Sequence, residues 1–279
     1  MNLITRVITM IRSGLSTDHY YNVMNHALKR VNNDDYTMLH YPLYINESDT
    51  FLQAQENLTD HCISGINSLE NKTILEIGCG NGVQTKYILN KYKPKSMTGI
   101  DLNKENIRIA NQEKDRRGMK NVHFFVDDAQ QLSKFKENSI DVIINIESAF
   151  HYPDKPLFLK QLFRVLKPGG HFLIADILTT YKKKKWLKKN WKKKMVYHHW
   201  DQKKYEKELA NAKLKTTRFE DITPGVIHGF GNYRIWLKDM KKGGFFENRF
   251  YKLFYIINIR LNIFLLRTKR QYCIFSGIK

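Results

Sequence analysis

The chain has 279 residues, a formal net charge of +20 at pH 7 and three cysteines. Its length suits one α/β core with additions better than two domains. Because Cys62, Cys79 and Cys273 have unrelated spacings, they indicate neither a disulfide framework nor a metal site, and we expect a reducing, intracellular environment and no bound metal.

The first 50 residues contain two distinctive stretches. Between Met1 and Arg12, apolar residues recur at helical spacing beside Arg6 and Arg12. This stretch is too short and too polar for a secretory signal or a spanning helix, but it suits a helix lying on a membrane surface. Residues 18–21 and 36–44 are dense in tyrosine and histidine, and a linking helix is expected over residues 51–69.

A strand followed by a glycine-rich turn begins the predicted core. The apolar run from Ile74 to Ile77 is typical of a strand that is covered on both faces, and Gly78, Gly80 and Gly82 follow it. Glycines adopt positive φ angles and leave no Cβ between the main chain and a ligand. Dinucleotide-binding folds and plain strand-to-helix corners also use glycines. The turn alone therefore does not identify the ligand. A helix is expected over residues 83–92.

Three further strands are predicted, and each ends in polar residues. Residues 96–101 end at Asp101, about 20 residues beyond the glycines, where an acid that binds ribose hydroxyls is expected. Residues 121–126 lead into Asp127, Asp128 and Ala129, and residues 140–147 lead into the segment 148–154. Open parallel sheets bind ligands at the carboxyl ends of their strands, so these residues are site candidates.

The remainder combines regular elements with a basic insert. An apolar stripe in residues 159–166 predicts a helix, and Leu166–Gly170 predicts a corner before the next strand. Nine lysines fall between Lys182 and Lys194, together with Trp186 and Trp191. A helix over residues 201–214, a strand over 215–222, a long excursion containing the apolar run 250–266 and a last strand over 271–277 complete the prediction.

The ordered motifs resemble those of the class I S-adenosylmethionine-dependent methyltransferases. Glu76 with the glycine turn, Asp101, Asp128-Ala129 and Leu166–Gly170 occur in the family's order across residues 70 to 178. The resemblance implies a Rossmann-like, doubly wound α/β fold with a seven-stranded, mostly parallel sheet, an N-terminal helical lid and helical insertions. It predicts a helical and aromatic cap over residues 1–52 and a methyltransferase domain over 53–279, with a basic insert at 179–200 and a helical excursion at 223–269.

The resemblance also implies a cofactor site for S-adenosyl-L-methionine, whose product is S-adenosyl-L-homocysteine. The glycine turn would pack against the methionyl part, Asp101 would accept the ribose hydroxyls, and Asp128 and Ala129 would lie near the adenine. The expected cofactor residues are Glu76, Gly78, Cys79, Gly80, Gly82, Asp101, Leu102, Asp128, Ala129 and Asn145. We expect Cys79 to be a small buried residue and not a nucleophile.

The segment from Glu147 to Asp154 resembles its equivalent in sterol, tocopherol and sugar O-methyltransferases. In the sugar enzymes the matching histidine is the general base, and a histidine that titrates near neutrality suits that task, so His151 is the first candidate. Glu147 and His40 are further catalytic candidates. A loop histidine that only shapes the pocket remains the alternative for His151. The lid would bring Tyr20, Tyr21, Tyr36 and Tyr41 to the substrate, although half of these would simply pack.

These features predict methyl transfer to a hydroxyl of a hydrophobic small molecule such as a lipid, isoprenoid or polyketide. Carbon methylation of an isoprenoid or sterol-like substrate is the first alternative. A nucleic-acid methyltransferase or binding protein that uses the lysine block is the second, and it is disfavoured because no RNA-binding module is recognisable. We expect a cytoplasmic protein with peripheral membrane contact through Lys182–Lys194 and the N-terminus.

Overall fold

The computed structural model describes residues 17–32, 35–180, 197–239 and 249–279. The amphipathic stretch of residues 1–12 and the lysine block Lys182–Lys194, both expected to contact a membrane, lie outside these residues. In the described part of the chain, no helix is long and apolar enough to cross a bilayer.

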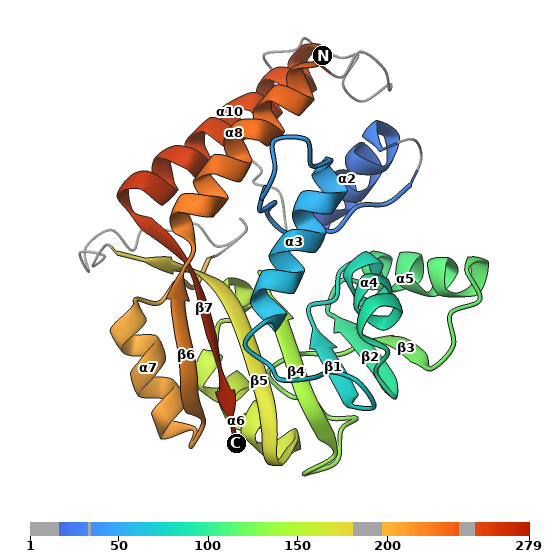
Figure 1. The fold of residues 1–279 in the computed structure, drawn as a ribbon, viewed down its shortest axis with the longest axis vertical. Helices are drawn as coiled ribbons and strands as arrows, with labels where there is room; N and C mark the ends of the chain where they lie inside the picture. The colour runs from blue at the N-terminus through green and yellow to red at the C-terminus, as the bar shows by residue number, and fades with distance from the viewer. Residues whose placement is uncertain (1–16, 33–34, 181–196, 240–248) are drawn as a thin grey trace.

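A seven-stranded sheet with the order β3-β2-β1-β4-β5-β7-β6 forms the centre of the molecule (Figure 1). The pairs among β1 to β5 are parallel, whereas β7 pairs antiparallel with both β5 and β6. The expected seven-stranded, mostly parallel sheet is therefore confirmed. The strands are β1 Thr73–Ile77, β2 Ser96–Asp101, β3 Val122–Val126, β4 Ile140–Ile146, β5 Leu166–Thr179, β6 Lys215–Asp221 and β7 Arg270–Ile278.

Successive residues of each strand serve opposite faces of the sheet, and helices cover both faces. In β5, Leu173 and Ala175 join a core with one set of helices, whereas Phe172 and Ile174 join a second core with another set. The first face is covered by α3 Phe51–Ile63, α4 Val83–Tyr92 and α5 Lys104–Arg116, and α8 Thr223–Asp239 and α10 Arg249–Thr268 add side chains to its core. The second is covered by α6 Lys155–Val165 and α7 Gln202–Asn211.

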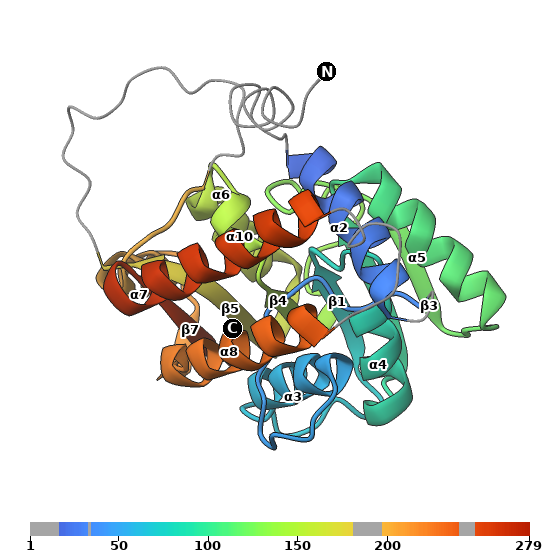
Figure 2. The same ribbon diagram turned by 90° about the horizontal axis from the view of Figure 1, so that it is seen from above.

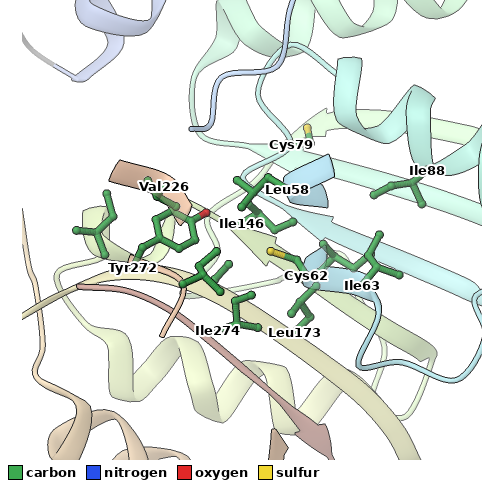
Figure 3. Packing of buried hydrophobic residues seen from close by; sticks show 14 of the residues in the cluster. Leu58, Cys62, Ile63, Cys79, Ile88, Ile146, Leu173, Val226, Tyr272 and Ile274 are labelled. Carbon is green, nitrogen blue, oxygen red and sulfur yellow. The ribbon is translucent and has the colours of Figure 1, made fainter. Parts of the chain in front are cut away.

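The packing of α3 against the sheet ties the chain before the sheet to its last strand. Leu58 and Cys62 of α3 lie beside Leu173 of β5 and Tyr272 and Ile274 of β7 (Figure 3). All five side chains are buried. Burying a large apolar side chain contributes roughly 1.5–3 kcal/mol, so this contact holds α3 firmly on the sheet.

Two expected boundaries differ from the structure. The linking helix α3 begins at Phe51, where Thr50 and Gln53 form a capping box, but it ends at Ile63 and not at Leu69. Ser64, Gly65 and Asn67 follow, and residues of these types favour turns over helix continuation. The corner Leu166–Gly170 is part of β5, where Lys167–Gly170 bulge opposite Asp141 because Leu166 pairs with Ile140 and His171 with Val142.

Three helices lie beyond the carboxyl ends of the parallel strands. Helices α8 and α10 pack together and rise from this edge of the sheet, and α2, Thr17–Val31, lies beyond α3 and α4 (Figures 1 and 2). The short 3-10 helix η1, Ala149–His151, follows β4. This arrangement places the N-terminal cap and the two late helices around the edge of the sheet where a ligand is expected.

Candidate functional site

A cleft with about 1090 Å³ of empty space, part of it open to solvent, lies at the carboxyl ends of β1 to β4. Its walls come from the glycine turn after β1, the exits of β2, β3 and β4, helix α2 and the segment 38–40. The structure therefore brings together at one cleft the polar residues that follow four separate strands. This cleft is the candidate active site.

The glycine turn has the backbone conformation that its sequence predicts. Gly78, Gly80 and Gly82 have φ angles of +75°, +55° and +79°. The N–H groups of Gly78 and Cys79 both donate to the Ile100 carbonyl, so the turn is fixed to β2. A Cβ on Gly78 would lie 2.3 Å from Ser148 Oγ, which leaves no room for any side chain. The bare backbone of Gly78 and Gly80 lines the cleft.

Two members of the predicted turn motif support the turn and do not line the cleft. Gly82 lies against α5, where an added Cβ would come within 2.9 Å of the Ala110 Cβ. Glu76 is buried and accepts a hydrogen bond from Thr85 Oγ1 at 2.5 Å, and burial raises its pKa to about 8. Cys79 lines the cleft but is buried, and burial raises the pKa of its thiol well above the usual range, so it has no nucleophilic character.

Asp101 lies where a ribose-binding acid is expected. One carboxylate oxygen accepts the Gly80 N–H at 3.0 Å and the other accepts the Asn103 N–H at 2.8 Å, while burial raises the carboxyl pKa. The side chain lines the cleft and also accepts a hydrogen bond from the Asn106 side chain; because a carboxylate has about four acceptor positions, capacity remains for a ribose hydroxyl. Leu102 is exposed and forms part of the cleft wall next to Asp101.

The two aspartates after β3 differ in their hydrogen bonding, which the sequence did not reveal. Asp128 and Ala129 line the cleft, but one Asp128 oxygen already accepts the Gln130 backbone N–H at 2.8 Å and its side-chain amide at 3.1 Å. Asp127 also lines the cleft, and its buried Oδ2 has no hydrogen-bond partner among the described residues. Asp127 is therefore an additional candidate for a polar ligand group, and its position beside Asp128 was the only signal in the sequence.

Asn81 fastens the cap to the turn, although the sequence suggested no role for its side chain. Its amide donates to Asn25 Oδ1 and to the Thr37 carbonyl, both at 2.8 Å, and the Asn25 amide donates to Asn106 of α5 at 2.7 Å. All three asparagine side chains are buried. These hydrogen bonds link α2 to the glycine turn and to α5, and they therefore hold the cap over the cleft.

At the exit of β4, Asn145 supports the wall and is not part of the cleft lining. Its side-chain amide donates to the Ile77 carbonyl at 3.0 Å and lies 3.0 Å from the Tyr152 hydroxyl. Ser148 completes the group, with its Oγ 2.7 Å from the same tyrosine hydroxyl. These bonds hold the ends of β1 and β4 together beside the glycine turn.

Glu147 and His151 both line the cleft and face the cap. One Glu147 oxygen accepts the Tyr41 backbone N–H at 2.6 Å, and burial raises the Glu147 pKa to about 8. His151 Nε2 lies 3.0 Å from the Tyr21 hydroxyl, while burial lowers the His151 pKa to about 4. His151 is therefore neutral at pH 7, and the expectation that it titrates near neutrality is not met. A neutral imidazole can accept a proton.

The four predicted lid tyrosines lie in different places. Tyr21 lines the cleft. Tyr20 packs edge-on against the Tyr21 ring, with 5.3 Å between the ring centres. Tyr41 packs on Phe230 of α8, with 4.3 Å between ring centres. Tyr36 lies away from the cleft, under the ammonium of Lys29 and near α4 and α5. Helical and loop sequences do not reveal which tyrosines turn inward.

His40 lines the cleft, but both of its ring nitrogens have protein partners. Nδ1 lies 2.9 Å from the Tyr41 carbonyl, and Nε2 lies 3.2 Å from Thr59 Oγ1 and near the Met38 sulfur. Burial lowers its pKa to about 4. Because its nitrogens are engaged in this way, His40 fits a role in fixing the segment 38–41 better than a role as base.

The chemistry of the cleft fits S-adenosylmethionine. The bare backbone of Gly78, the partly buried carboxylate of Asp101 and the segment Asp127 to Ala129 all line the same cleft. They match a molecule with an uncharged ribose, an adenine and an amino-acid tail. Charged phosphates would face Asp101 and Asp127 here, which disfavours a phosphorylated dinucleotide.

Comparisons with known proteins identify the kind of domain to which this cleft belongs. A family model described as a methyltransferase domain matches residues 68–214. A fatty-acid O-methyltransferase of Mycolicibacterium smegmatis is 33% identical over 172 residues, which are 59% of this chain and 61% of the relative. A phthiotriol/phenolphthiotriol dimycocerosates methyltransferase of Mycobacterium leprae is 32% identical over 190 residues, 68% of this chain and 62% of the relative. The alignments thus span about three fifths of these relatives.

Solved structures share the fold at low sequence identity. The [4+2]-cyclase SpnF superposes with a TM-score of 0.75 at 17% identity, covering 95% of this chain and 97% of SpnF. The cyclopropane synthase MmaA2 of Mycobacterium tuberculosis has a TM-score of 0.72 at 17% identity, covering 96% of both chains. The chain belongs to the class I S-adenosylmethionine-dependent methyltransferases. The cofactor of this class is S-adenosyl-L-methionine.

The raised pKa of Glu147 predicts a change of stability with pH. A carboxyl that is protonated in the folded protein up to about pH 8, but ionised in the unfolded chain above its ordinary pKa of 4.5, destabilises the fold as pH rises between these values. For one group the slope is about 1.4 kcal/mol per pH unit. Glu147→Gln keeps an acceptor for Tyr41 and removes this titration, so we expect its stability relative to wild type to increase from pH 5 to pH 8.

Urea unfolding at several pH values measures this difference. Glu47→Gln removes an exposed carboxylate from the loop before α3 and is the control. Because the control keeps Glu147, its stability should follow that of the wild type across the range. A constant difference between Glu147→Gln and the wild type at all pH values would show that Glu147 is ionised in the folded protein.

Proposed function

We propose that this enzyme transfers a methyl group to a hydroxyl oxygen of a hydrophobic small molecule, with His151 as the general base. The observation that carries the proposal is the hydroxyl of Tyr21, which lies 3.0 Å from His151 Nε2 inside the cleft. This pair shows that a hydroxyl group can reach the imidazole from the cap side. An acceptor hydroxyl that replaced the Tyr21 hydroxyl would meet a neutral base.

The residues around the cleft supply the other requirements of the reaction. When bound, S-adenosylmethionine supplies a methyl group on a positively charged sulfur. Asp101 would hold the ribose, and the Gly78 backbone would pack against the methionyl part. His151 would take the proton of the acceptor hydroxyl, and Tyr21 would release Nε2 and bind elsewhere. Glu147, protonated below about pH 8, adds no negative charge beside the base at neutral pH.

The proposed substrate is lipophilic because of the composition of the cap side and the relatives. Tyr41 and Phe230 form an apolar cluster together with Tyr272, close to Glu147. The similar proteins from Mycolicibacterium and Mycobacterium include a fatty-acid O-methyltransferase. These two facts support a lipid, isoprenoid or polyketide acceptor. The proposed setting is the cytoplasm with membrane contact, to which Lys182–Lys194 and the N-terminus would contribute.

His151→Ala tests the assignment of the base. Loss of general-base catalysis is expected to lower the rate of methyl transfer to a long-chain alcohol by roughly 10²–10⁴-fold. Binding of S-adenosylmethionine, measured by calorimetry, should stay within about threefold of wild type, because Asp101 and the glycine turn are unchanged. His123→Ala, at an exposed position on β3, is the matched control and should retain full activity. A His151→Ala enzyme with near-normal turnover would contradict the assignment.

Carbon methylation of an isoprenoid is a second candidate, and the aromatic cluster favours it. Tyr41 packs edge-on against Phe230, its ring centre lies 6.0 Å from that of Tyr272, and its backbone N–H binds Glu147, so this cluster lies behind the Glu147 wall of the cleft. Aromatic faces stabilise a cationic intermediate. In this case Tyr41→Leu should lose more activity than His151→Ala. Under the proposed O-methylation the order is reversed, and the two variants assayed with an alcohol and a prenyl substrate separate the candidates.

A further inference from the structure

The outer face of α10 combines exposed apolar side chains with regular spacing. Ile257, Leu261 and Phe264 are 55%, 52% and 55% exposed, and their spacing of four and three residues places them on one side of the helix. On the other side, Ile259 and Leu266 are buried in the core that covers the sheet. Helix α10 therefore has one face fixed to the protein and a second apolar face in water.

Two arginines accompany this apolar face. Arg260 and Arg267 are exposed one heptad apart, and they border a hollow of about 710 Å³ whose other walls include Phe264 and, from α8, Ile227 and Gly231. Neither guanidinium forms an ion pair with any residue that the structure describes. The sequence of α10 contains no acidic residue. The face is therefore positively charged without internal compensation.

We infer that this face of α10 lies on a membrane surface that contains anionic phospholipids. The three apolar side chains would enter the boundary between headgroups and acyl chains, and the two guanidinium groups would bind lipid phosphates. The occupant follows from charge complementarity, because an apolar row flanked by two arginines, on a helix without acidic residues, matches a surface with a negative outer layer and an apolar interior. Since α10 cannot span a bilayer, it would lie parallel to the surface.

The buried side of α10 connects this surface with the site. Asn262 accepts a hydrogen bond from the Tyr41 hydroxyl at 3.4 Å, and the Tyr41 N–H in turn binds Glu147 in the cleft. A membrane on the outer face would thus lie one helix away from the cap segment that covers the substrate side. The benefit for catalysis rests on the proposed lipid substrate, but membrane binding is measurable without methyl transfer, so the two proposals fail separately.

A fluorescent reporter on α10 tests the inference in the full chain. The three native cysteines are buried, so a Leu261→Cys variant can be labelled selectively with a polarity-sensitive dye. Vesicles of phosphatidylglycerol and phosphatidylcholine should shift the emission to the blue, and pure phosphatidylcholine vesicles should produce a much smaller shift. Ser68→Cys, exposed in the loop before β1 at the opposite edge of the sheet, is the control and should show no shift.

Vesicle sedimentation supplies the energetic test. The double variant Leu261→Ser and Phe264→Ser is expected to bind anionic vesicles at least about tenfold more weakly, with unchanged binding of S-adenosylmethionine. Charge reversal at Arg260 and Arg267 should lower binding roughly fivefold per arginine. The lysine block is intact in every variant, so vesicle binding that persists unchanged, with no emission shift at position 261, would assign the membrane contact elsewhere and overturn the inference.

Discussion

An Asp101→Ala variant is expected to bind S-adenosylmethionine at least about 100-fold more weakly than the wild type. A hydrogen bond to a charged group contributes about 1.5–3 kcal/mol, and this carboxylate is placed to accept a ribose hydroxyl. The same side chain also accepts the N–H groups of Gly80 and Asn103. Its removal therefore loses ligand contacts and loosens the glycine turn against which the cofactor packs.

Calorimetric titration measures this loss, and two other variants make it interpretable. Asp115→Ala removes an exposed acid from the adjoining helix α5 and should bind the cofactor like wild type. Asp101→Asn keeps one acceptor oxygen and the side-chain shape, so its affinity should lie between those of the wild type and Asp101→Ala. If Asp101→Ala bound the cofactor within threefold of wild type while remaining folded by circular dichroism, the ribose assignment would be wrong.

Replacing Lys155 with methionine is expected to reduce the free energy of unfolding by about 3–5 kcal/mol. Lys155 Nζ lies 2.8 Å from Asp176 Oδ2, and the two side chains are 1% and 0% exposed. Methionine keeps most of the aliphatic volume, so the loss would come from the unpaired charge left at Asp176 and not from a cavity. The Tyr205 hydroxyl, which donates to the same carboxylate oxygen, limits the loss without cancelling it.

A second lysine–aspartate ion pair, which is partly exposed to solvent, serves as the control. Lys167 Nζ and Asp141 Oδ1 are also 2.8 Å apart, but their side chains are 41% and 24% exposed. Lys167→Met should therefore cost less than about 1 kcal/mol. Adding Asp176→Asn to Lys155→Met should recover part of the lost stability because the buried charge disappears. Equal urea midpoints for Lys155→Met and Lys167→Met would contradict the expected cost of burying an unpaired charge.

The core of the fold was predictable because local patterns and the sheet impose the same constraints. Helix α4 and strand β2 begin and end at the predicted residues. Gly82 precedes the first residue of α4, Asp101 is the last residue of β2, and turn residues separate the two elements. The positive φ angles at Gly78 and Gly80 follow from the glycine spacing. Asp101 comes to the cleft because it ends a parallel strand, and parallel strands deliver their last residues to one edge.

The cap was predictable in composition but not in detail. The inward position of Tyr21 and the outward position of Tyr36 depend on where α2 docks, which the distant residues Asn81 and Asn106 decide. The partners of His40 come from Thr59 and the neighbouring backbone, and no spacing rule places them there. Similarly, the lowered pKa of His151 reflects burial, which arises only when the cap and the sheet come together.

The order of the last strands has a consequence for biosynthesis. In the described sheet β6 pairs with β7 alone, and β7 lies between β5 and β6 although it is synthesised after both. During translation, β6 and the edge of β5 that faces β7 have no strand partner until α8 and α10 have been synthesised. An unpaired strand edge readily joins another chain, so the nascent protein is most exposed to aggregation in this interval. Its yield in cells should depend on chaperones that protect β5 and β6 until β7 arrives.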